Sequence, residues 1–318
     1  MSDDEADPEL LALLRQSLGI EPSDVNAPAE TKVLEGAEYI YNNSIDIALD
    51  TKGCKAAANT IWALMQEKEY STKTWSTHEL HPKAKDESTV DFIFTMDVLN
   101  FCFWSEKGPD ERFAVEYTGK RWTGYWSLVA TLNRALDEGE FTYSWESELQ
   151  LRAHESLEIP ITSPDFWQDE NEYTSEKLRH VFRSATDEEI PLFEERMACL
   201  REAGQVLYKV SNRRKDSEDC ANSSQRFDCK FSNCIKEAQG SAAALVNLLV
   251  EHFPCFRDEF RFEGKKVRFY KRAQILVADL WACFEGERYG RFEDIDKITM
   301  FAGISTHIQI SVSLAYQE

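Results

Sequence analysis

Apolar residues recur at helical spacing in several parts of the chain. The clearest stripe lies in residues 271–286 and ends at Gly286; it is formed by Ala273, Leu276, Val277, Leu280, Trp281 and Phe284. A second stripe is followed by Gly139, which stands where a C-terminal cap would; it is formed by Tyr125, Leu128, Val129, Leu132 and Leu136. Both segments are predicted to be amphipathic helices with one face in the core.

Shorter helical patterns fill much of the remaining sequence. Two of them lie in 32–70, and another, in 241–253, is apolar enough to predict a buried helix. Thr174 and Ser175 are cap candidates for the helix that follows them. Pro191 stands where the first turn of the next predicted helix tolerates proline.

Two stretches alternate between apolar and polar residues instead. Residues 113–122 alternate around a turn predicted at Thr118-Gly119, and a similar pattern surrounds Glu263-Gly264. These stretches predict two β-hairpins. Together with the helical patterns they indicate a mainly α fold with short β-hairpins, in a single domain.

Three polar segments interrupt these patterns. Residues 1–30 are acidic and contain three prolines, which indicates a flexible lead-in. Residues 140–158 and 211–228 carry little apolar content and are predicted to be loops. The predicted domain therefore begins near residue 31.

The charge of the chain limits its partners. Its 318 residues carry a formal net charge of −21, and a protein that grips a nucleic-acid backbone needs Lys and Arg instead. A small-molecule ligand is therefore favoured, and no direct nucleic-acid binding is expected. No apolar run reaches the roughly 18 residues of a membrane span, and the N-terminus is acidic where a secretory signal would be basic. We expect a location in the cytoplasm or nucleus and no membrane partner.

The common cofactor and metal motifs do not occur. The sequence lacks the glycine-rich dinucleotide and phosphate-binding patterns and the nucleophile elbow of α/β-hydrolases. Its eight cysteines form no C-x-x-C pair, and its six histidines form no H-E-x-x-H. No metal and no cofactor are predicted.

Aromatic residues gather before and inside the second helical stripe. Trp122, Tyr125 and Trp126 lie close together, and Asn100 and Trp104 belong to another aromatic segment. Such rings stack on flat heterocycles, and an asparagine side chain offers both a donor and an acceptor to a base edge. The same density is typical of a hydrophobic core, which spacing alone favours.

Three charged residues are further candidates. Asp279 lies off the apolar stripe of its helix, which indicates an exposed or ion-paired carboxylate. Asp294 precedes an apolar turn and is either a polar catalyst or the cap of a helix beginning near Lys297. Lys271 follows two aromatic residues and is either a phosphate ligand or an ordinary exposed lysine.

Several long motifs carry a family resemblance. They occur in order between about residues 35 and 302 and include "DVLNFCFWSE", "YTGKRWTGYWSLVATLNRALDEG", "IPITS", "LRHVFRSATDEEIPLFEER", "FEGKKVRFYKRAQILVADLW" and "FEDIDKITMFA". Together they resemble the queuosine salvage family, whose members are queuosine 5′-phosphate N-glycosylase/hydrolases.

The resemblance implies a fold and a reaction. Such proteins resemble helix-hairpin-helix DNA glycosylases, yet they cleave a free nucleotide and release the 7-deazaguanine base queuine for reinsertion into tRNA. The resemblance implies that Phe301 touches the base, and it makes Asn100, Trp104, Tyr125 and Trp126 candidates for the pocket or its supporting wall. Lys271 and Asp294 remain the candidates for phosphate binding and polar catalysis.

The resemblance breaks near the end of the chain. Family members continue through a segment resembling "MFADYRVPQ", whereas here the sequence reads "MFAGISTHIQ" and Gly303 stands where the aspartate is expected. We therefore expect a glycosylase-like domain over 31–302, which is incomplete, and an unrelated tail over 303–318. Such a chain is expected to be weakly active or inactive, with the stripe of 273–284 left uncovered.

Two other functions stay open at this point. One is a non-catalytic protein that binds a deazapurine nucleotide or an RNA. The other is a nucleic-acid glycosylase, which the charge of −21 disfavours.

Overall fold

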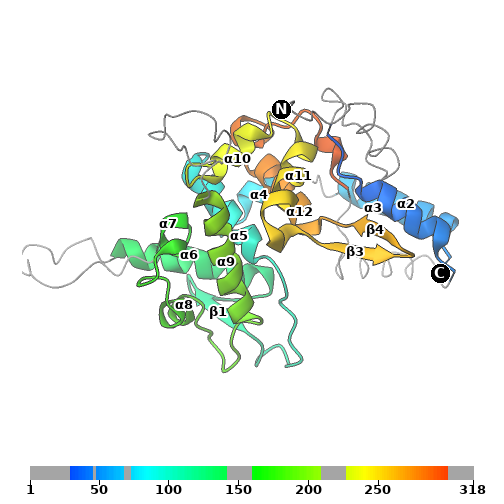
Figure 1. Cartoon of the computed structure of the whole chain (residues 1–318). Helices are drawn as coiled ribbons and strands as arrows, with labels where there is room; N and C mark the ends of the chain where they lie inside the picture. Colours follow the sequence, from blue (N-terminus) through cyan, green and yellow to red (C-terminus); the bar gives the residue numbers. More distant parts are fainter. Residues whose placement is uncertain (1–28, 46–47, 68–72, 142–159, 209–226, 300–318) are drawn as a thin grey trace, which may run out of the picture. The chain divides into compact units, whose positions relative to one another are not determined.

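The computed structural model describes residues 29–45, 48–67, 73–141, 160–208 and 227–299. The chain divides into two units, 1–30 and 31–318, and all the elements below belong to the second. In the described ranges helices dominate, and the strands form two separate two-stranded sheets (Figure 1). The prediction of a mainly α fold is confirmed. None of the described helices is long and apolar enough to cross a membrane.

The helices run in the following order along the chain. The first are α2 (Val33–Asn43), α3 (Thr51–Glu67), α4 (Lys73–Thr77), α5 (Glu87–Leu99) and α6 (Tyr125–Phe141). They are followed by α7 (Pro164–Gln168), α8 (Ser175–Val181), α9 (Phe193–Tyr208), α10 (Phe231–Glu237), α11 (Ala242–His252) and α12 (Lys271–Cys283). Short 3-10 turns are η1 (Pro254–Phe256), η2 (Arg288–Gly290) and η3 (Ile295–Lys297).

Both predicted hairpins are present. Strands β1 (Ala114–Tyr117) and β2 (Lys120–Thr123) are antiparallel, as are β3 (Glu259–Phe262) and β4 (Lys265–Arg268). The two residues of each turn, Thr118-Gly119 and Glu263-Gly264, have positive φ angles. Two left-handed residues in succession give the turn whose twist matches the twist of paired strands, and glycine is the residue that adopts this conformation most easily.

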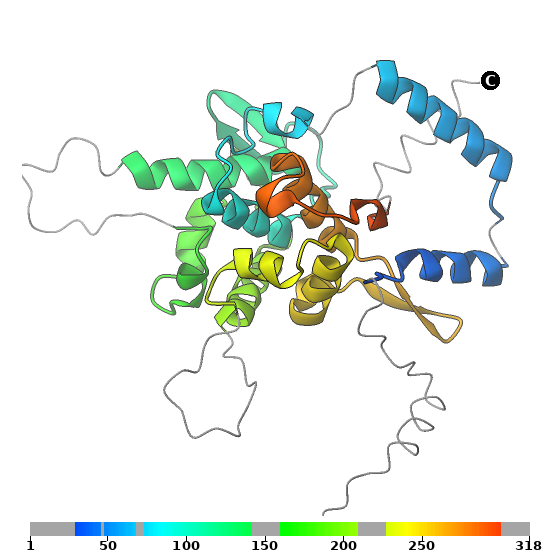
Figure 2. The same ribbon diagram turned by 90° about the horizontal axis from the view of Figure 1, so that it is seen from above.

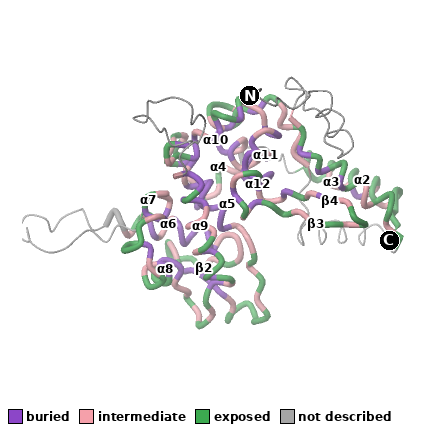
Figure 3. Tube along the Cα trace, in the orientation of Figure 1, coloured by how far each residue is buried: buried purple, intermediate pink, exposed green. Residues whose placement is uncertain are grey.

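Helix α5 lies at the centre of the packing. It contacts α6, α9, α10 and α12, and ten of its thirteen residues are buried (Figures 2 and 3). Its sequence is therefore apolar on almost every side instead of amphipathic. The helix begins where Asp86 Oδ1 accepts a hydrogen bond from the Thr89 backbone N–H at 3.2 Å, which satisfies one of the free donors of the first turn.

A buried arginine fixes the chain where α5 ends. Arg196, on α9, is fully buried, and its guanidinium donates to the carbonyl oxygens of Leu99, Phe101 (2.5 Å) and Cys102 (2.8 Å). Its Nε also donates to the Pro191 carbonyl at 2.9 Å. A guanidinium has five N–H donors, so it satisfies several carbonyls that would otherwise be buried without partners. The segment that carries Asn100 is therefore held rigidly.

Two predicted helix boundaries are wrong. Helix α6 continues through Gly139 to Phe141 instead of ending at the glycine. A glycine inside a helix costs only about 1 kcal/mol, and the buried turns that precede it hold α6 in place. Helix α9 begins at Phe193, so Pro191 lies before it; Leu192 has a φ of +57°, which interrupts the helical backbone between them. The predicted cap is confirmed, since the Thr174 side chain accepts from the Lys177 backbone N–H.

The apolar stripe of α12 is covered. Four of its residues are fully buried and Phe284 nearly so, the four being Ala273, Leu276, Val277 and Leu280. The expectation of an uncovered stripe is wrong, because α4, α5 and α11 pack against α12. Gly286, with a φ of +76°, donates its backbone N–H to the Trp281 carbonyl, which confirms the predicted end of the helix.

Asp294 caps a helix, but not the one that was predicted. Its carboxylate accepts from the Ser241 hydroxyl at 2.7 Å and from the Ala242 backbone N–H at 2.5 Å, at the start of α11. Around Lys297 there is only the short turn η3, which has no side-chain cap. A carboxylate at a helix N-terminus both satisfies free N–H groups and complements the helix dipole.

Replacing Asp294 is expected to lower stability. Because Asp294→Ala removes the acceptor of both bonds, the free energy of unfolding should fall by about 1–2 kcal/mol. Urea denaturation measures this loss. The exposed side chain of the neighbouring Glu293 forms an ion pair with Arg291 at 3.7 Å, so Glu293→Ala should change stability by less than about 0.5 kcal/mol. Equal effects of the two substitutions would contradict the assignment.

Candidate functional site

Two aspartates meet where α5 packs on α12. Asp97 has no solvent exposure; its Oδ1 accepts from Asn100 Nδ2 at 3.2 Å, and its Oδ2 is buried without a hydrogen-bond partner. Asp279 is partly buried, and its Oδ1 accepts from Trp75 Nε1 at 3.0 Å. A buried carboxylate oxygen without a partner is rare in proteins and marks a site that a structural role does not explain.

The surroundings of this pair favour neutral carboxyls. Removal from water raises the pKa of Asp279 to about 7, although the Trp75 N–H opposes this shift. Burial, and then the charge of Asp279, raises the pKa of Asp97 well above its usual range; the Asn100 amide and Arg272 oppose this only in part. Like charges so close cannot both ionise easily, so the pair holds a proton near neutral pH.

The position of Asp279 corrects the sequence analysis, which predicted an exposed or ion-paired carboxylate. Leu276 precedes it by three residues and Cys283 follows it by four, and both are buried. Positions three and four apart share one face of a helix. Asp279 therefore lies beside the packed stripe and next to α5, instead of facing solvent.

A layer of aromatic and histidine rings borders the acid pair. The Trp75 ring stacks on His81 with centroids 3.8 Å apart, and the Trp126 ring stacks on His78 with centroids 3.4 Å apart. Tyr125 lies against His81 edge to face. The charges of both aspartates, after burial itself, help to raise the pKa of the Tyr125 hydroxyl, so this ring lies close to the pair.

The three rings that precede and begin α6 belong partly to the core and partly to the border of the site. Trp122, Tyr125 and Trp126 are half-buried, and all three pack against the main hydrophobic core. They therefore have one face in the core and one edge turned to the segment that follows α4. Asn133 holds this segment from α6, because its Nδ2 donates to the Leu80 carbonyl at 2.7 Å.

The structure brings some of the predicted residues together and separates others. Asn100 bonds to Asp97, Tyr125 lies beside the pair, and Trp126 belongs to the ring layer. Trp104 is 70% exposed. Lys271 lies at the start of α12, where its backbone N–H donates to Asp258 Oδ2 at 3.0 Å.

Three other residues were singled out from the sequence: Asp294, Phe301 and Gly303. The Asp294 carboxylate is bound to the start of α11, as described above, and no contact joins it to the acid pair. Phe301 and Gly303 lie outside the described residues.

Sequence reasoning missed four residues of this cluster. They are Asp97, Asp279 as a buried group, Trp75 and His81. A signal for Asp97 existed, because it is the one carboxylate in the mainly apolar run 92–99 of a largely buried helix. Trp75 and His81 carried no such signal, since their bonds to Asp279 and Tyr125 depend on tertiary packing across more than 40 residues of sequence.

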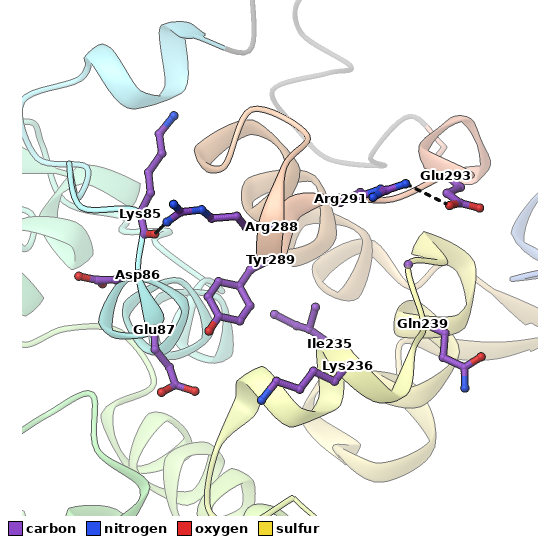
Figure 4. A pocket seen from close by; sticks show the side chains of 11 residues that line it. Lys85, Asp86, Glu87, Ile235, Lys236, Gln239, Arg288, Tyr289, Arg291 and Glu293 are labelled. Carbon is purple, nitrogen blue, oxygen red and sulfur yellow. Dashed lines mark hydrogen bonds and ion pairs between the residues drawn. The ribbon is translucent and has the colours of Figure 1, made fainter.

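An open depression of about 870 Å³ lies elsewhere, between the start of α5, α10 and η2 (Figure 4). Its lining mixes both charges, and its acids already have partners; Glu87, for example, accepts from Ser232 and pairs with Lys230. On its rim Arg291 pairs with Glu293. None of the candidate residues from the sequence lines it. The acid pair is therefore the stronger candidate site.

Metal ligands do not gather in the described ranges. Among these residues no group of three or more His, Cys, Asp or Glu side chains is placed to hold a metal ion. The pair of Asp97 and Asp279 has hydrogen-bond donors around it instead, from Asn100 and Trp75. The arrangement is suited to proton and hydrogen-bond chemistry.

Comparison with known proteins places the chain in a family. The family described as queuosine salvage protein matches residues 80–148 and 145–315, which include the acid pair and the Tyr125 ring. A protein of Schizosaccharomyces pombe is 41% identical over 278 residues, covering 86% of this chain and 70% of that protein. The chain belongs to the queuosine salvage protein family.

Other members of the family agree with this assignment. Proteins of Nematostella vectensis and Bos taurus are 40% and 39% identical, each over 84% of this chain and over 66% and 67% of their own length. These relatives and the yeast protein are named queuosine 5′-phosphate N-glycosylase/hydrolase. The chain thus spans about two thirds of the length of these queuosine salvage proteins.

The acid pair should make stability depend on pH. The folded chain holds protons on these carboxyls that the unfolded chain, with a pKa near 3.8, releases. Stability should therefore fall as the pH rises from about 4 to about 7, and in Asp97→Asn this fall should be smaller by about 1–3 kcal/mol. Urea denaturation at a series of pH values measures the difference. The exposed Asp110 provides a matched control, and Asp110→Asn should follow the wild type; parallel curves for all three proteins would refute the shift.

Proposed function

We propose that this chain carries the site of an N-glycosyl hydrolase that cleaves queuosine 5′-phosphate into queuine and ribose 5-phosphate. The observation that carries the proposal is the pair Asp97 and Asp279, two carboxyls whose pKa values are raised by burial, beside a layer of rings. Family membership and the names of the relatives support the substrate. Queuine released in this way is available for reinsertion into tRNA.

The reaction sets two demands on the site. When the bond between ribose C1′ and the base nitrogen breaks, its electron pair leaves with the base, and positive charge develops on the sugar. Water then attacks C1′ and loses a proton, and the base gains one. The base lacks the N7 of a purine, so it cannot leave by protonation there. A negative group must stabilise the sugar, and a hydrogen-bond donor must assist the base at another edge.

The acid pair meets both demands. Asp279 is the more accessible member, and its pKa of about 7 suits proton transfer at neutral pH. We assign to it the negative charge that stabilises the sugar. Asp97 is the more deeply buried member, and we assign the proton to it. Its unpartnered Oδ2 is then the donor available to the base. Two carboxyls with different surroundings, and hence different roles, are the usual arrangement in glycoside hydrolysis.

The surrounding residues would hold the base. Tyr125 and Trp126 are assigned to the wall on which a flat heterocycle rests. Asn100, which bonds to Asp97, is assigned to a base edge. Phe301 and Trp104 remain proposed base contacts, and Lys271 remains a proposed phosphate ligand. Asp294 is left with its capping role.

The sequence also bears on the proposed fold, the kind of substrate and the location of the chain. A fold like that of helix-hairpin-helix DNA glycosylases, over residues 31–302, would supply an aromatic pocket for a base. The charge of −21 favours a free nucleotide over a nucleic acid. The proposed location is the cytoplasm or nucleus. No cofactor is needed, because water is the only co-reactant.

Replacing either aspartate should reduce queuine release. Incubation of queuosine 5′-phosphate with the chain, followed by chromatography, measures the release. Asp279→Asn should lower the rate by about 100-fold or more, since charge stabilisation worth several kcal/mol is lost, and Asp97→Asn should also lower it. Asp110→Asn, on the exposed surface, should leave the rate unchanged.

The same experiment distinguishes the alternatives. Calorimetry with queuosine 5′-phosphate that detects binding, without release in any version of the chain, would support a non-catalytic binding protein. Comparison with a version that carries the corresponding family sequence after Ala302 tests whether that sequence contributes to queuine release. Normal release by the Asp97→Asn and Asp279→Asn variants would contradict the proposed roles.

A further inference from the structure

The indole of Trp75 donates a hydrogen bond to the Asp279 member of the acid pair. Its Nε1–H donates to Asp279 Oδ1 at 3.0 Å across 204 residues of sequence. Trp75 lies on α4, a helix of only five residues, which packs against α12. So short a helix cannot fix a side chain by itself, so the orientation of the indole depends on what contacts it.

His81 makes those contacts at two points. Its ring stacks on the Trp75 ring with centroids 3.8 Å apart and planes inclined by 17°. Its Nδ1 also lies 2.8 Å from the Trp75 carbonyl oxygen. The histidine therefore holds both the backbone and the ring of Trp75.

The partners of His81 fix its tautomer. A carbonyl oxygen only accepts, so Nδ1 must carry the proton that bonds to Trp75. The other nitrogen, Nε2, lies 2.8 Å from the Tyr125 hydroxyl. In the neutral ring this nitrogen is an acceptor, and the Tyr125 hydroxyl donates to it. Burial lowers the pKa of His81 to about 4, which keeps the ring neutral at physiological pH.

We propose that His81 is a positioning residue for Asp279: as the neutral Nδ1–H tautomer, oriented by Tyr125, it holds the Trp75 indole so that Nε1–H bonds to the Asp279 carboxylate. This inference rests on the proposed function only in treating Asp279 as a reacting group. The hydrogen bonds themselves are those of the protein without substrate. A chain of bonds from Tyr125 through His81 and Trp75 thus ends on the acid pair.

The titration of Asp279 provides a direct readout. A donor to a carboxylate stabilises the charged form, so loss of the Trp75 bond should raise the pKa of Asp279. The other titratable groups that face Asp279 are Asp97 on α5, Tyr125 on α6 and Cys283 on α12. None of them is changed in the variants below.

The experiment is carbon-13 NMR of the chain with labelled aspartate carboxyls, titrated without substrate, with Asp279→Asn providing the assignment. Trp75→Phe keeps a ring but loses the donor and should raise the pKa of Asp279 by about one unit. His81→Leu should raise it by a similar amount. The double variant should raise the pKa of Asp279 no further than either single variant does, because both substitutions act through the same bond.

Two further variants separate positioning from general damage. In His81→Asn the amide N–H can replace Nδ1–H toward the Trp75 carbonyl, so the titration should return toward the wild type. His78→Leu makes the same change at a neighbouring histidine that stacks on Trp126 instead, and should leave Asp279 unchanged. Amide spectra of each variant verify the fold, and His81→Asn and Trp75→Phe keep the test valid if His81→Leu does not fold.

Several results would overturn the proposal. An Asp279 pKa unchanged in Trp75→Phe would show that the bond has no effect, and one unchanged in His81→Leu would show that His81 does not hold it. Additive effects in the double variant would show that His81 acts by another route. These outcomes do not depend on catalysis, so a failure to release queuine would count against the proposed function alone.

Discussion

The structure depends on the burial of α5. A helix that packs against four others must be apolar on most sides, and Asp97 is the one carboxyl among the buried residues of this helix. A carboxyl in that position cannot ionise without a large loss of solvation free energy, and no cation is bonded to it. Burial therefore raises the pKa of this carboxyl and favours its protonated form.

Other parts of the fold serve to keep this acid in place. Arg196 fixes the end of α5 through backbone carbonyls, so that Asn100 reaches Asp97. Helix α12 brings Asp279 alongside, and the ring layer closes the remaining side. The contacts of Arg196 with the end of α5, and of α12 with α5, join segments that are distant in sequence. The site is thus a product of tertiary packing and not of any local motif.

Because the site depends on tertiary packing, only part of the structure could be predicted from the sequence. Both hairpins and the helices α6, α11 and α12 were predicted from periodicity, because apolar spacing and turn glycines act locally. Helix α5 was not predicted, because a helix buried on most sides shows no clear apolar stripe. Boundaries failed where packing overrode local preference, as at Gly139, or where a side chain served a distant element, as Asp294 does for α11.

The candidate site was predicted only in part. Asn100, Tyr125 and Trp126 were found through their aromatic neighbourhood and the family resemblance. Asp279 was misjudged, because a helical projection shows which face a residue occupies but not whether another helix covers that face. Trp75 and His81 have no pattern in the sequence, since their roles arise from one stacking contact and two hydrogen bonds.

The central claim is that Asp97 holds a proton inside the folded chain at neutral pH. Infrared difference spectroscopy between the wild type and Asp97→Asn measures this directly, because a protonated carboxyl and a carboxylate absorb at different frequencies. The account predicts that the wild type shows the band of a protonated, buried carboxyl at neutral pH and that the variant lacks it. A wild-type spectrum in which Asp97 contributes only a carboxylate band would contradict the account.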